Sequence, residues 1–260
     1  MISSSQNPKL KLIRALQGRA KERRDAGAIL VEGVRLVEEA VHSNWPMRFA
    51  LYDETLSERG KSQVESLKSH GVDVEEVSTS LMKSLSETES PQGILAVLEL
   101  IQLPITNYPT FILIPDQIRD PGNLGTLLRT AAAAGVQAVL LPPETADAFA
   151  PKVLRSGMGA HFSLPIHSMT WDEINQVVKL ANLKVFLADM DGPSCWEMNL
   201  QNPLALVIGG EADGASEQAR ELANEKISIS MPGQAESLNA GVAGSVLMFE
   251  VVRQRQSKNS

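Results

Sequence analysis

The sequence contains a single cysteine, Cys195, among its 260 residues. One thiol excludes an intrachain disulfide and a thiol-rich metal site, and a reducing, cytoplasmic location is the default expectation. The four histidines show no metal-ligand spacing. We therefore expect no disulfide, no metal and a cytoplasmic protein.

Long apolar segments are also missing. No stretch approaches the ~18 uninterrupted apolar residues that a membrane span needs. The start of the chain, Met1 to Leu10, has no apolar run of the signal-peptide type. We expect no association with a membrane.

Positive charge is scarce overall, and the formal net charge is −7. This balance argues against a nucleic-acid partner, because phosphate contacts come from Lys and Arg. The distribution argues the other way, since residues 9–24 are rich in Lys and Arg and contain one acid, Glu22. Leucines and an isoleucine are interleaved with these cations, which predicts a basic helix with an apolar stripe. A solvated helix face without a ligand is the alternative.

Short apolar runs alternate with helical patterns along the rest of the chain, which predicts an α/β fold. Residues 1–103 are expected to form a smaller α/β domain, and residues 104–260 a second domain with a parallel sheet. The boundary lies in a segment that contains Pro104 and Pro109. In parallel sheets the ligand site lies at the carboxyl ends of the strands, so the loops after Pro115, Ile208 and Ser230 are the candidates.

The first candidate loop contains Asp120-Pro-Gly-Asn123, a strong turn signal in which Asn123 is expected to cap a helix. Arg129 follows among leucines and alanines. Long helical side chains lean toward the helix N-terminus, so Arg129 is expected to pass over Gly125 and reach the loop. A buried structural ion pair is the alternative for Arg129.

The second loop is Gly209-Gly210-Glu211, directly after an apolar strand. Glycines there let the backbone approach a ligand. The spacing is neither Gly-x-Gly-x-x-Gly nor that of a phosphate-binding loop, and a simple glycine-rich turn is the alternative.

The third loop lies around Met231, just after Ile229, and leads into a long helix that is expected to begin with Ser237-Leu238-Asn239. Asn239 is expected in the first turn, where polar ligands bind well. Ser237 alone is explained equally well as a helix cap.

In this order, the three loops resemble the signature motifs of the SpoU (TrmH-like) branch of the SPOUT methyltransferases. The matching patterns are Asp120-Pro-Gly-Asn123-x-Gly125 with Arg129, Gly209-x-Glu211-x-x-Gly214, and Ser237-Leu238-Asn239. The N-terminal part is similar to the family's substrate-binding domain at Asn7-Pro8, Val31 to Arg35 and Ser90 to Gly93. Three departures are Ser230, where the family has proline, Ala212, where it has glycine, and Ala215, where it has a larger apolar residue.

The resemblance implies a deep trefoil knot in the C-terminal domain, S-adenosyl-L-methionine as cofactor, and a homodimer formed through that domain. It implies methyl transfer to a ribose 2′-hydroxyl, and the separate N-terminal domain favours large-subunit ribosomal RNA over transfer RNA as the expected substrate. The expected cofactor-binding residues are Gly209, Gly210, Ile229, Met231 and Leu238.

The resemblance also assigns roles in catalysis and RNA binding. Arg129 is expected to position the hydroxyl and stabilise its negative charge, because a guanidinium is a poor base at neutral pH. Asn123, Glu211, Ser237 and Asn239 are expected to orient the reactants. The expected RNA-binding residues are Lys9, Lys11, Arg14, Arg19, Arg23, Arg24 and Arg35.

Four alternatives remain open from the sequence. They are a transfer-RNA substrate, a catalytically silent RNA-binding or ribosome-assembly factor on the same fold, a base methyltransferase of another SPOUT branch, and an oxidoreductase on a Rossmann sheet. The missing Gly-x-Gly-x-x-Gly argues against the oxidoreductase.

Overall fold

A computed structural model describes residues 7–106, 108–211, 214–233 and 237–257. The chain forms two compact units. The first comprises Met1–Ile101 together with Phe149–Phe162, and the second comprises Gln102–Ala148 and Ser163–Ser260. None of the helices in the described ranges combines the length and apolar character that crossing a membrane requires.

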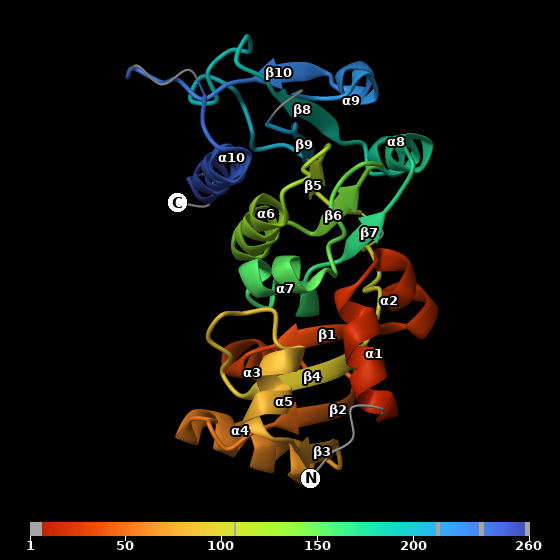
Figure 1. Ribbon diagram of the computed structural model, residues 1–260. Helices are drawn as coiled ribbons and strands as arrows, with labels where there is room; N and C mark the ends of the chain where they lie inside the picture. Colours follow the sequence, from red (N-terminus) through yellow and green to blue (C-terminus); the bar gives the residue numbers. More distant parts are fainter. Residues whose placement is uncertain (1–6, 107, 212–213, 234–236, 258–260) are drawn as a thin grey trace. The chain divides into compact units, whose positions relative to one another are not determined.

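The first unit is a small α/β structure built on a four-stranded sheet (Figure 1). Its elements are α1 (Pro8–Gln17), α2 (Ala20–Ala26), β1 (Ala28–Glu32), α3 (Val34–His42), β2 (Met47–Tyr52), α4 (Glu58–Ser69), β3 (Asp73–Glu76), α5 (Thr79–Leu85), β4 (Ile94–Glu99), α7 (Pro151–Gly157) and the 3₁₀ helix η1 (Ala160–Phe162). The strand order is β1-β4-β2-β3. Strand β4 is antiparallel to β1 and β2, and β3 is parallel to β2.

Helices α1 and α5 supply the apolar stripe that covers one face of this sheet. Leu10, Ile13 and Leu16 of α1 are fully buried in one core cluster with Met82 and Leu85 of α5. Their spacing of three residues places them on one side of α1, as the apolar stripe predicted.

The basic segment is two helices and not one, because α1 ends at Gln17 and α2 begins at Ala20. The break is stabilised by Arg23, whose guanidinium donates to the carbonyl oxygens of Leu16 (2.6 Å) and Gly18 (2.9 Å). Glu22 accepts a hydrogen bond from the Arg19 amide and caps the second helix. The prediction of a continuous helix was wrong because a glycine and two local hydrogen bonds favour a turn there.

The second unit is built on a six-stranded, entirely parallel sheet. Its elements are β5 (Phe111–Pro115), α6 (Pro121–Ala133), β6 (Ala138–Leu141), β7 (Ile166–Ser168), α8 (Trp171–Leu180), β8 (Lys184–Ala188), β9 (Leu204–Ile208), α9 (Glu217–Leu222), β10 (Glu225–Ile227) and α10 (Ala240–Gln256). The predicted α/β class and parallel sheet are confirmed.

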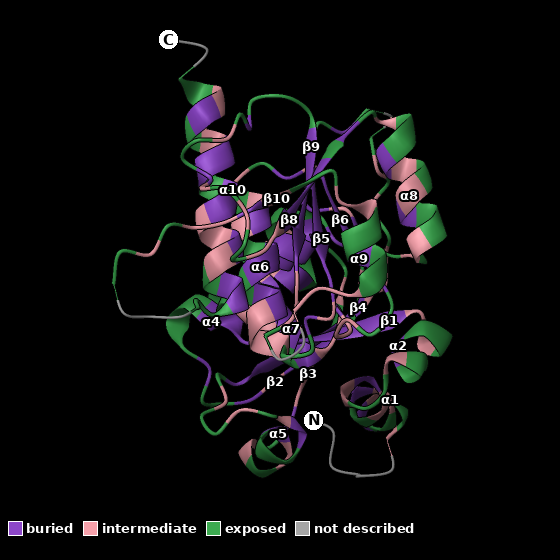
Figure 2. Cartoon of the chain, turned by 90° about the horizontal axis from the view of Figure 1, so that it is seen from above, coloured by how far each residue is buried: buried purple, intermediate pink, exposed green. Residues whose placement is uncertain are grey.

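The parallel sheet is covered on both faces, so its strands are apolar throughout. Helices α6 and α10 lie on one face and α8 and α9 on the other (Figure 2). Ile112, Ile114 and Val207 belong to the core cluster that includes α8 and α9. All five residues of β5 and of β9 are buried, as expected for strands between two helical layers.

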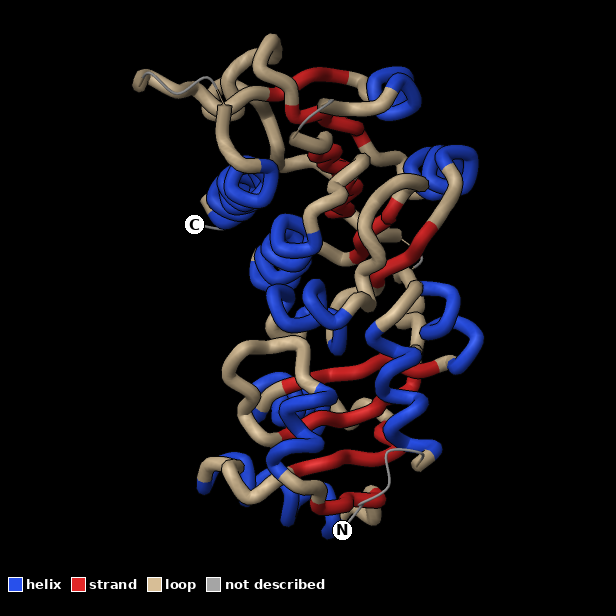
Figure 3. The backbone as a smooth tube through the Cα atoms, in the orientation of Figure 1, coloured by secondary structure: helices blue, strands red, loops and turns tan. Residues whose placement is uncertain are grey.

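The strand order of the second sheet, β10-β8-β9-β5-β6-β7, creates a switch point between β5 and β9. From β5 the chain moves outward through β6 and β7, and β9 later inserts between β5 and β8. In register, Pro115 pairs with Ile208, and Ile227 with Ala188, so these strands end at one edge of the sheet. The tube in Figure 3 shows the loops that extend from this edge. A ligand site is expected there.

Candidate functional site

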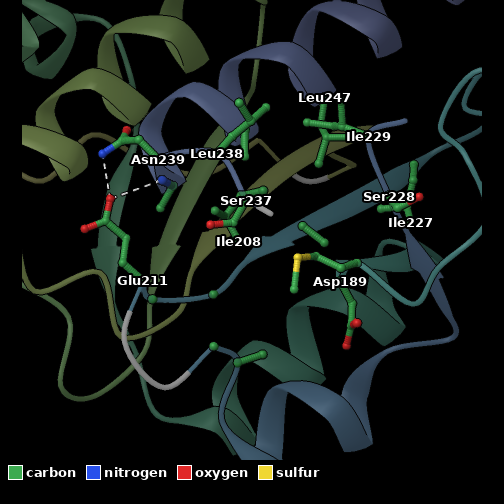
Figure 4. A pocket seen from close by; sticks show the side chains of 18 of the residues that line it. Asp189, Ile208, Glu211, Ile227, Ser228, Ile229, Ser237, Leu238, Asn239 and Leu247 are labelled. Atoms are coloured by element: carbon green, nitrogen blue, oxygen red, sulfur yellow. Dashed lines mark hydrogen bonds between the residues drawn. The ribbon is translucent and has the colours of Figure 1, made fainter. Parts of the chain in front are cut away.

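A pocket of about 680 Å³ lies at the carboxyl edge of the parallel sheet. Its floor is formed by the ends of β8, β9 and β10, and its side by the beginning of α10 (Figure 4). It is lined by Ala188, Asp189, Met190, Ile208, Gly209, Gly210, Glu211, Gly214, Ala215, Arg220, Ile227, Ser228, Ile229, Met231, Ser237, Leu238, Asn239, Ala240, Ala243 and Leu247. The volume lies in the range of small-molecule and cofactor sites.

Glu211 joins the three predicted loops at one end of this pocket. Its Oε1 accepts hydrogen bonds from Nδ2 of Asn123 (2.7 Å), Nδ2 of Asn239 (2.6 Å) and the amide of Ala240 (3.3 Å). Nδ2 of Asn239 also donates to Oδ1 of Asn123 at 2.9 Å. We call Asn123, Glu211 and Asn239 the polar triad. The carboxylate holds the beginnings of α6 and α10 together at the end of β9.

The helix caps at this site differ from those predicted. Helix α6 is capped by Asp120, whose carboxylate accepts from the Asn123 amide at 2.8 Å. Pro121 is the first helical residue, a position that proline favours, and this moves the cap ahead of Asn123. Asn239, and not Ser237, caps α10 by accepting from the Val242 amide at 3.2 Å. The Asn123 side chain is therefore available to Glu211.

The loop after β9 folds tightly against itself. Gly210 and Gly214 exchange backbone hydrogen bonds of 3.0 and 3.1 Å. A β-carbon on Gly209 would lie 2.7 Å from the Ala215 amide nitrogen, so only glycine fits. The loop wall of the pocket thus depends on backbone packing.

Asp116 anchors the far end of this loop. It is fully buried, and its Oδ2 accepts from the Ser216 amide at 2.6 Å. Its Oδ1 has no hydrogen-bond partner in the described part of the chain. Burial raises the pKa of the Asp116 carboxyl above its ordinary value, although the bond from Ser216 acts in the opposite direction.

Asp189 lies at the other end of the pocket from Glu211 (Figure 4) and forms ion pairs there. Its Oδ2 lies 3.0 Å from Nζ of Lys226 and 3.3 Å from Nη1 of Arg220. Burial alone would raise the pKa of Asp189, but the Asp191 amide and Lys226 hold it below its ordinary value. No group of three or more metal-ligand side chains occurs among the residues with described coordinates.

Asp189, Met190 and Arg220 were missed in the sequence. A signal was available for Asp189, because it follows the apolar strand Lys184–Ala188 and so lies at the same edge as the other loops. Met190 and Arg220 belong to a loop and a short helix that carry no recognisable motif.

The structure brings together eight of the ten residues predicted for catalysis and cofactor binding as lining of this pocket. Asn123 joins them through its bond to Glu211. Ser230 donates to the hydroxyl of Ser194 at 2.7 Å, which ties the loop after β10 to the loop after β8. Ala212 lies outside the described residues.

Arg129 lies apart from the pocket of its own chain. It is exposed on α6, lines neither this pocket nor its neighbours, and forms no hydrogen bond or ion pair with the described residues. The alternative of a buried structural ion pair is therefore wrong. The expectation that Arg129 reaches over Gly125 into the loop is not met within the chain.

The basic residues predicted to contact RNA divide into two groups in the first unit. The exposed ones are Lys11, Arg14, Arg19, Arg24 and Arg35. Lys9 forms ion pairs with Asp73 and Glu75. Arg23 is 3% exposed and donates to backbone carbonyls, so its role is to hold the turn between α1 and α2.

Both units of the chain match known protein families. The sequence profile of the SpoU rRNA Methylase family matches residues 110–249, and that of the MRM3-like substrate binding domain matches residues 7–96. The 23S rRNA (guanosine(2553)-2′-O)-methyltransferase RlmP of Bacillus subtilis is 35% identical over 96% of this chain and 98% of its own. The 23S rRNA (uridine(2479)-2′-O)-methyltransferase of Streptomyces viridochromogenes is 32% identical over 98% of this chain and 92% of its own.

Solved structures show the same architecture. The SpoU methyltransferase AviRb from Streptomyces viridochromogenes in complex with AdoMet superimposes with a TM-score of 0.86. It is 31% identical, and the match covers 97% of this chain and 99% of that chain. Both the profile and the full-length relatives identify this chain as a member of the SpoU rRNA methylase family.

Proposed function

We propose that this protein transfers a methyl group from S-adenosylmethionine to a ribose 2′-hydroxyl of large-subunit ribosomal RNA. The observation that carries the proposal is the polar triad, in which three separate loops meet at the mouth of a cofactor-sized pocket. Relatives named as 23S rRNA 2′-O-methyltransferases cover nearly the whole chain and support the same reaction.

The pocket fits S-adenosylmethionine in size and chemistry. Backbone of the glycine loop and the apolar Ile229, Leu238 and Leu247 line its middle, and polar groups lie at both ends. Such a lining suits a long zwitterionic ligand with an aromatic base. When bound, the sulfonium of the cofactor supplies an electrophilic methyl group.

The residues around the pocket then have to orient the hydroxyl and stabilise its charge. Glu211 fixes the amides of Asn123 and Asn239, and these side chains, with Ser237, orient the reactants. Arg129 holds the hydroxyl oxygen by hydrogen bonds and stabilises the negative charge that develops on it. The hydroxyl proton passes to water as the oxygen bonds the methyl group, and the bond from that methyl group to sulfur breaks to leave a neutral thioether. A guanidinium has five N–H donors and no acceptor, so Arg129 acts here as a hydrogen-bond donor and not as a base.

A homodimer through the second unit places Arg129 within reach of a pocket. Val242 and Phe249 are 47% and 49% exposed and lie seven residues apart on one side of α10. Helix α6, which carries Arg129, lies beside α10 on the same face of the sheet (Figure 2). A second copy that covers this apolar side would bring Arg129 of one subunit to the pocket of the other. An arginine outside its own pocket supports this arrangement.

The first unit is proposed to dock the RNA. Lys11, Arg14, Arg19, Arg24 and Arg35 are exposed on α1, α2 and α3, where their charges can contact phosphates.

The deep trefoil knot stays a prediction. It is supported by β9, which inserts between two strands that precede it in the chain. The cytoplasmic location also stays a prediction.

The function is tested by methyl transfer from labelled S-adenosylmethionine to total RNA from cells that lack the gene. Nucleoside analysis should find label in a 2′-O-methylnucleoside of ribosomal RNA.

We expect Arg129→Ala to lower kcat by about 10²–10³-fold. It should bind the cofactor and unfold like the unchanged protein, because an exposed side chain that bonds to none of the described residues contributes little stability.

Lys179→Ala is a matched control, since it removes an exposed cation from α8 on the opposite face of the sheet. It should keep full activity. Label found in transfer RNA instead would show that the substrate is transfer RNA and not ribosomal RNA. Cofactor binding without incorporation into any RNA would identify the protein as a silent RNA-binding factor.

A further inference from the structure

A second, smaller cavity of about 130 Å³ lies beside the polar triad. It is lined by Gln117, Ile118, Arg119, Asp120, Asn123, Gly210 and Glu211. Gly210 and Glu211 also line the cofactor pocket, so this one segment separates the two spaces. The volume exceeds that of several waters, about 30 Å³ each. It is below the roughly 300 Å³ at which pockets begin to enclose a whole ligand, so the cavity fits a fragment of one.

Gln117 lines this cavity and has an unused side-chain amide. Its side chain forms no hydrogen bond with the described residues, although it lines the space. Its backbone is left-handed, with φ of 54°, a conformation that costs energy for residues other than glycine. Strained backbone of this kind clusters at functional sites. The carbonyl of Gln117 approaches Gly210 so closely that a β-carbon there would lie 2.6 Å from it.

Arg119 lies at the exposed rim of the same cavity. It forms an ion pair with Glu144 at 2.6 Å, and the two side chains are 58% and 61% exposed. Exposed ion pairs of this kind contribute little to stability. Arg119 can therefore exchange Glu144 for a phosphate, whose geometry matches the guanidinium.

The charges of the residues that line the smaller cavity favour a neutral ligand over an anionic one. Asp120 and Glu211 place two carboxylates beside the single guanidinium of Arg119. A free phosphate dianion deep in the cavity would face both carboxylates. A neutral sugar inside the cavity, with one phosphate at the Arg119 rim, meets no such repulsion.

We propose that this cavity binds the ribose of the target nucleotide, with Gln117 donating and accepting hydrogen bonds and Arg119 holding the adjoining phosphate. The hydroxyl then lies next to Asn123 and Glu211, on the side that the cofactor pocket shares. This inference rests on the proposed function. Gln117 and Arg119 are, in this assignment, substrate-binding residues.

The test compares initial rates on ribosomal RNA from cells that lack the gene, at saturating S-adenosylmethionine. Arg119→Ala should raise KM for RNA about tenfold and leave kcat within about twofold, as expected for one lost charge-assisted contact. It should also lower the slope of log KM against log salt by about one, which is the signature of one phosphate contact. Gln117→Ala should raise KM several-fold without a change in salt slope.

Glu144→Gln distinguishes RNA binding from a structural ion pair. It removes the ion pair between Arg119 and Glu144, so KM should stay equal or fall. Equal increases in KM for Arg119→Ala and Glu144→Gln would overturn the proposal, because the ion pair itself would then be what matters. Unchanged KM in both Arg119→Ala and Gln117→Ala would overturn it too. Methyl transfer to ribosomal RNA by the unchanged protein tests the proposed function separately from the roles of Gln117 and Arg119.

Discussion

Asp116 is a carboxylate placed where ionisation is unfavourable. It is fully buried, and one of its oxygens has no partner among the described atoms, while the other holds the Ser216 amide. Burial raises its pKa, so the folded protein binds this proton more tightly than the unfolded chain does. The stability that this proton provides is complete below the unfolded pKa and is lost as pH rises through the folded pKa.

We predict that Asp116→Asn changes the pH dependence of unfolding. Asparagine keeps an acceptor for Ser216 and cannot ionise. Between about pH 4, where an unfolded aspartate titrates, and pH 7, the Tm of the unchanged protein should fall relative to that of the variant. Thermal unfolding across this range measures the difference, and Asp25→Asn controls for the change in net charge. Parallel curves for Asp116→Asn and the unchanged protein would contradict the prediction.

At the scale of single residues, the sequence predicted which residues form the polar triad better than it predicted which residues cap the helices. Asn123, Glu211 and Asn239 were recognised, and they meet as expected. The caps were misplaced because Pro121 and the turn before α10 decide where each helix begins. Arg23 was assigned to RNA, but it satisfies carbonyls at a helix break that helical periodicity does not reveal.

The loop between β9 and α9 supplies five of the residues that line the proposed cofactor pocket. We predict that Gly209→Ala lowers the affinity for S-adenosylmethionine about tenfold or more. The added β-carbon would lie 2.7 to 3.0 Å from backbone atoms of Gly214 and Ala215, so the loop has to move. Overpacking of this kind costs about 1–3 kcal/mol, and 1.4 kcal/mol corresponds to tenfold in affinity.

Calorimetric titration with the cofactor measures this effect. Gly233→Ala is the matched control, because a β-carbon there meets no described atom within 4 Å. Its affinity should equal that of the unchanged protein. An unchanged affinity in Gly209→Ala would show that the loop tolerates the shift.

Elements were predicted well where they are long and buried. The strands that lead into the predicted loops after Pro115 and Ile208 are Phe111–Pro115 and Leu204–Ile208, and they end where the sequence placed those loops because strands covered on both faces are apolar throughout. Helix α7 and strand β7 were not predicted. They have seven and three residues, too few to establish a periodic pattern.

At the scale of the whole molecule, the proposed dimer gives each active site residues from two chains. We predict that mixed dimers of Arg129→Ala and Asn239→Ala regain activity. If Arg129 acts across the interface, one site of each mixed dimer contains both an intact Arg129 and an intact Asn239. Co-expression with two different affinity tags isolates the mixed dimer, and its transfer rate should approach half that of the unchanged protein.

An arginine that acts within its own chain would leave the mixed dimer as inactive as either parent. The interface itself is tested by Val242→Glu combined with Phe249→Glu, which should give a folded monomer in light scattering. Leu180→Glu is the control, because Leu180 is equally apolar and 81% exposed on α8. It should remain dimeric.

The first unit is assembled from two separate stretches of chain. Helix α7 packs against β1, and Arg155 on this helix lies 3.4 Å from Glu32 and 3.2 Å from Glu87. A ribosome releases β5, α6 and β6 before it releases α7. The first unit therefore cannot complete its fold until α7 leaves the ribosome, and by then part of the second unit is already outside. The two folding processes overlap in time, and a fragment that stops at Ile101 lacks the helix that covers β1.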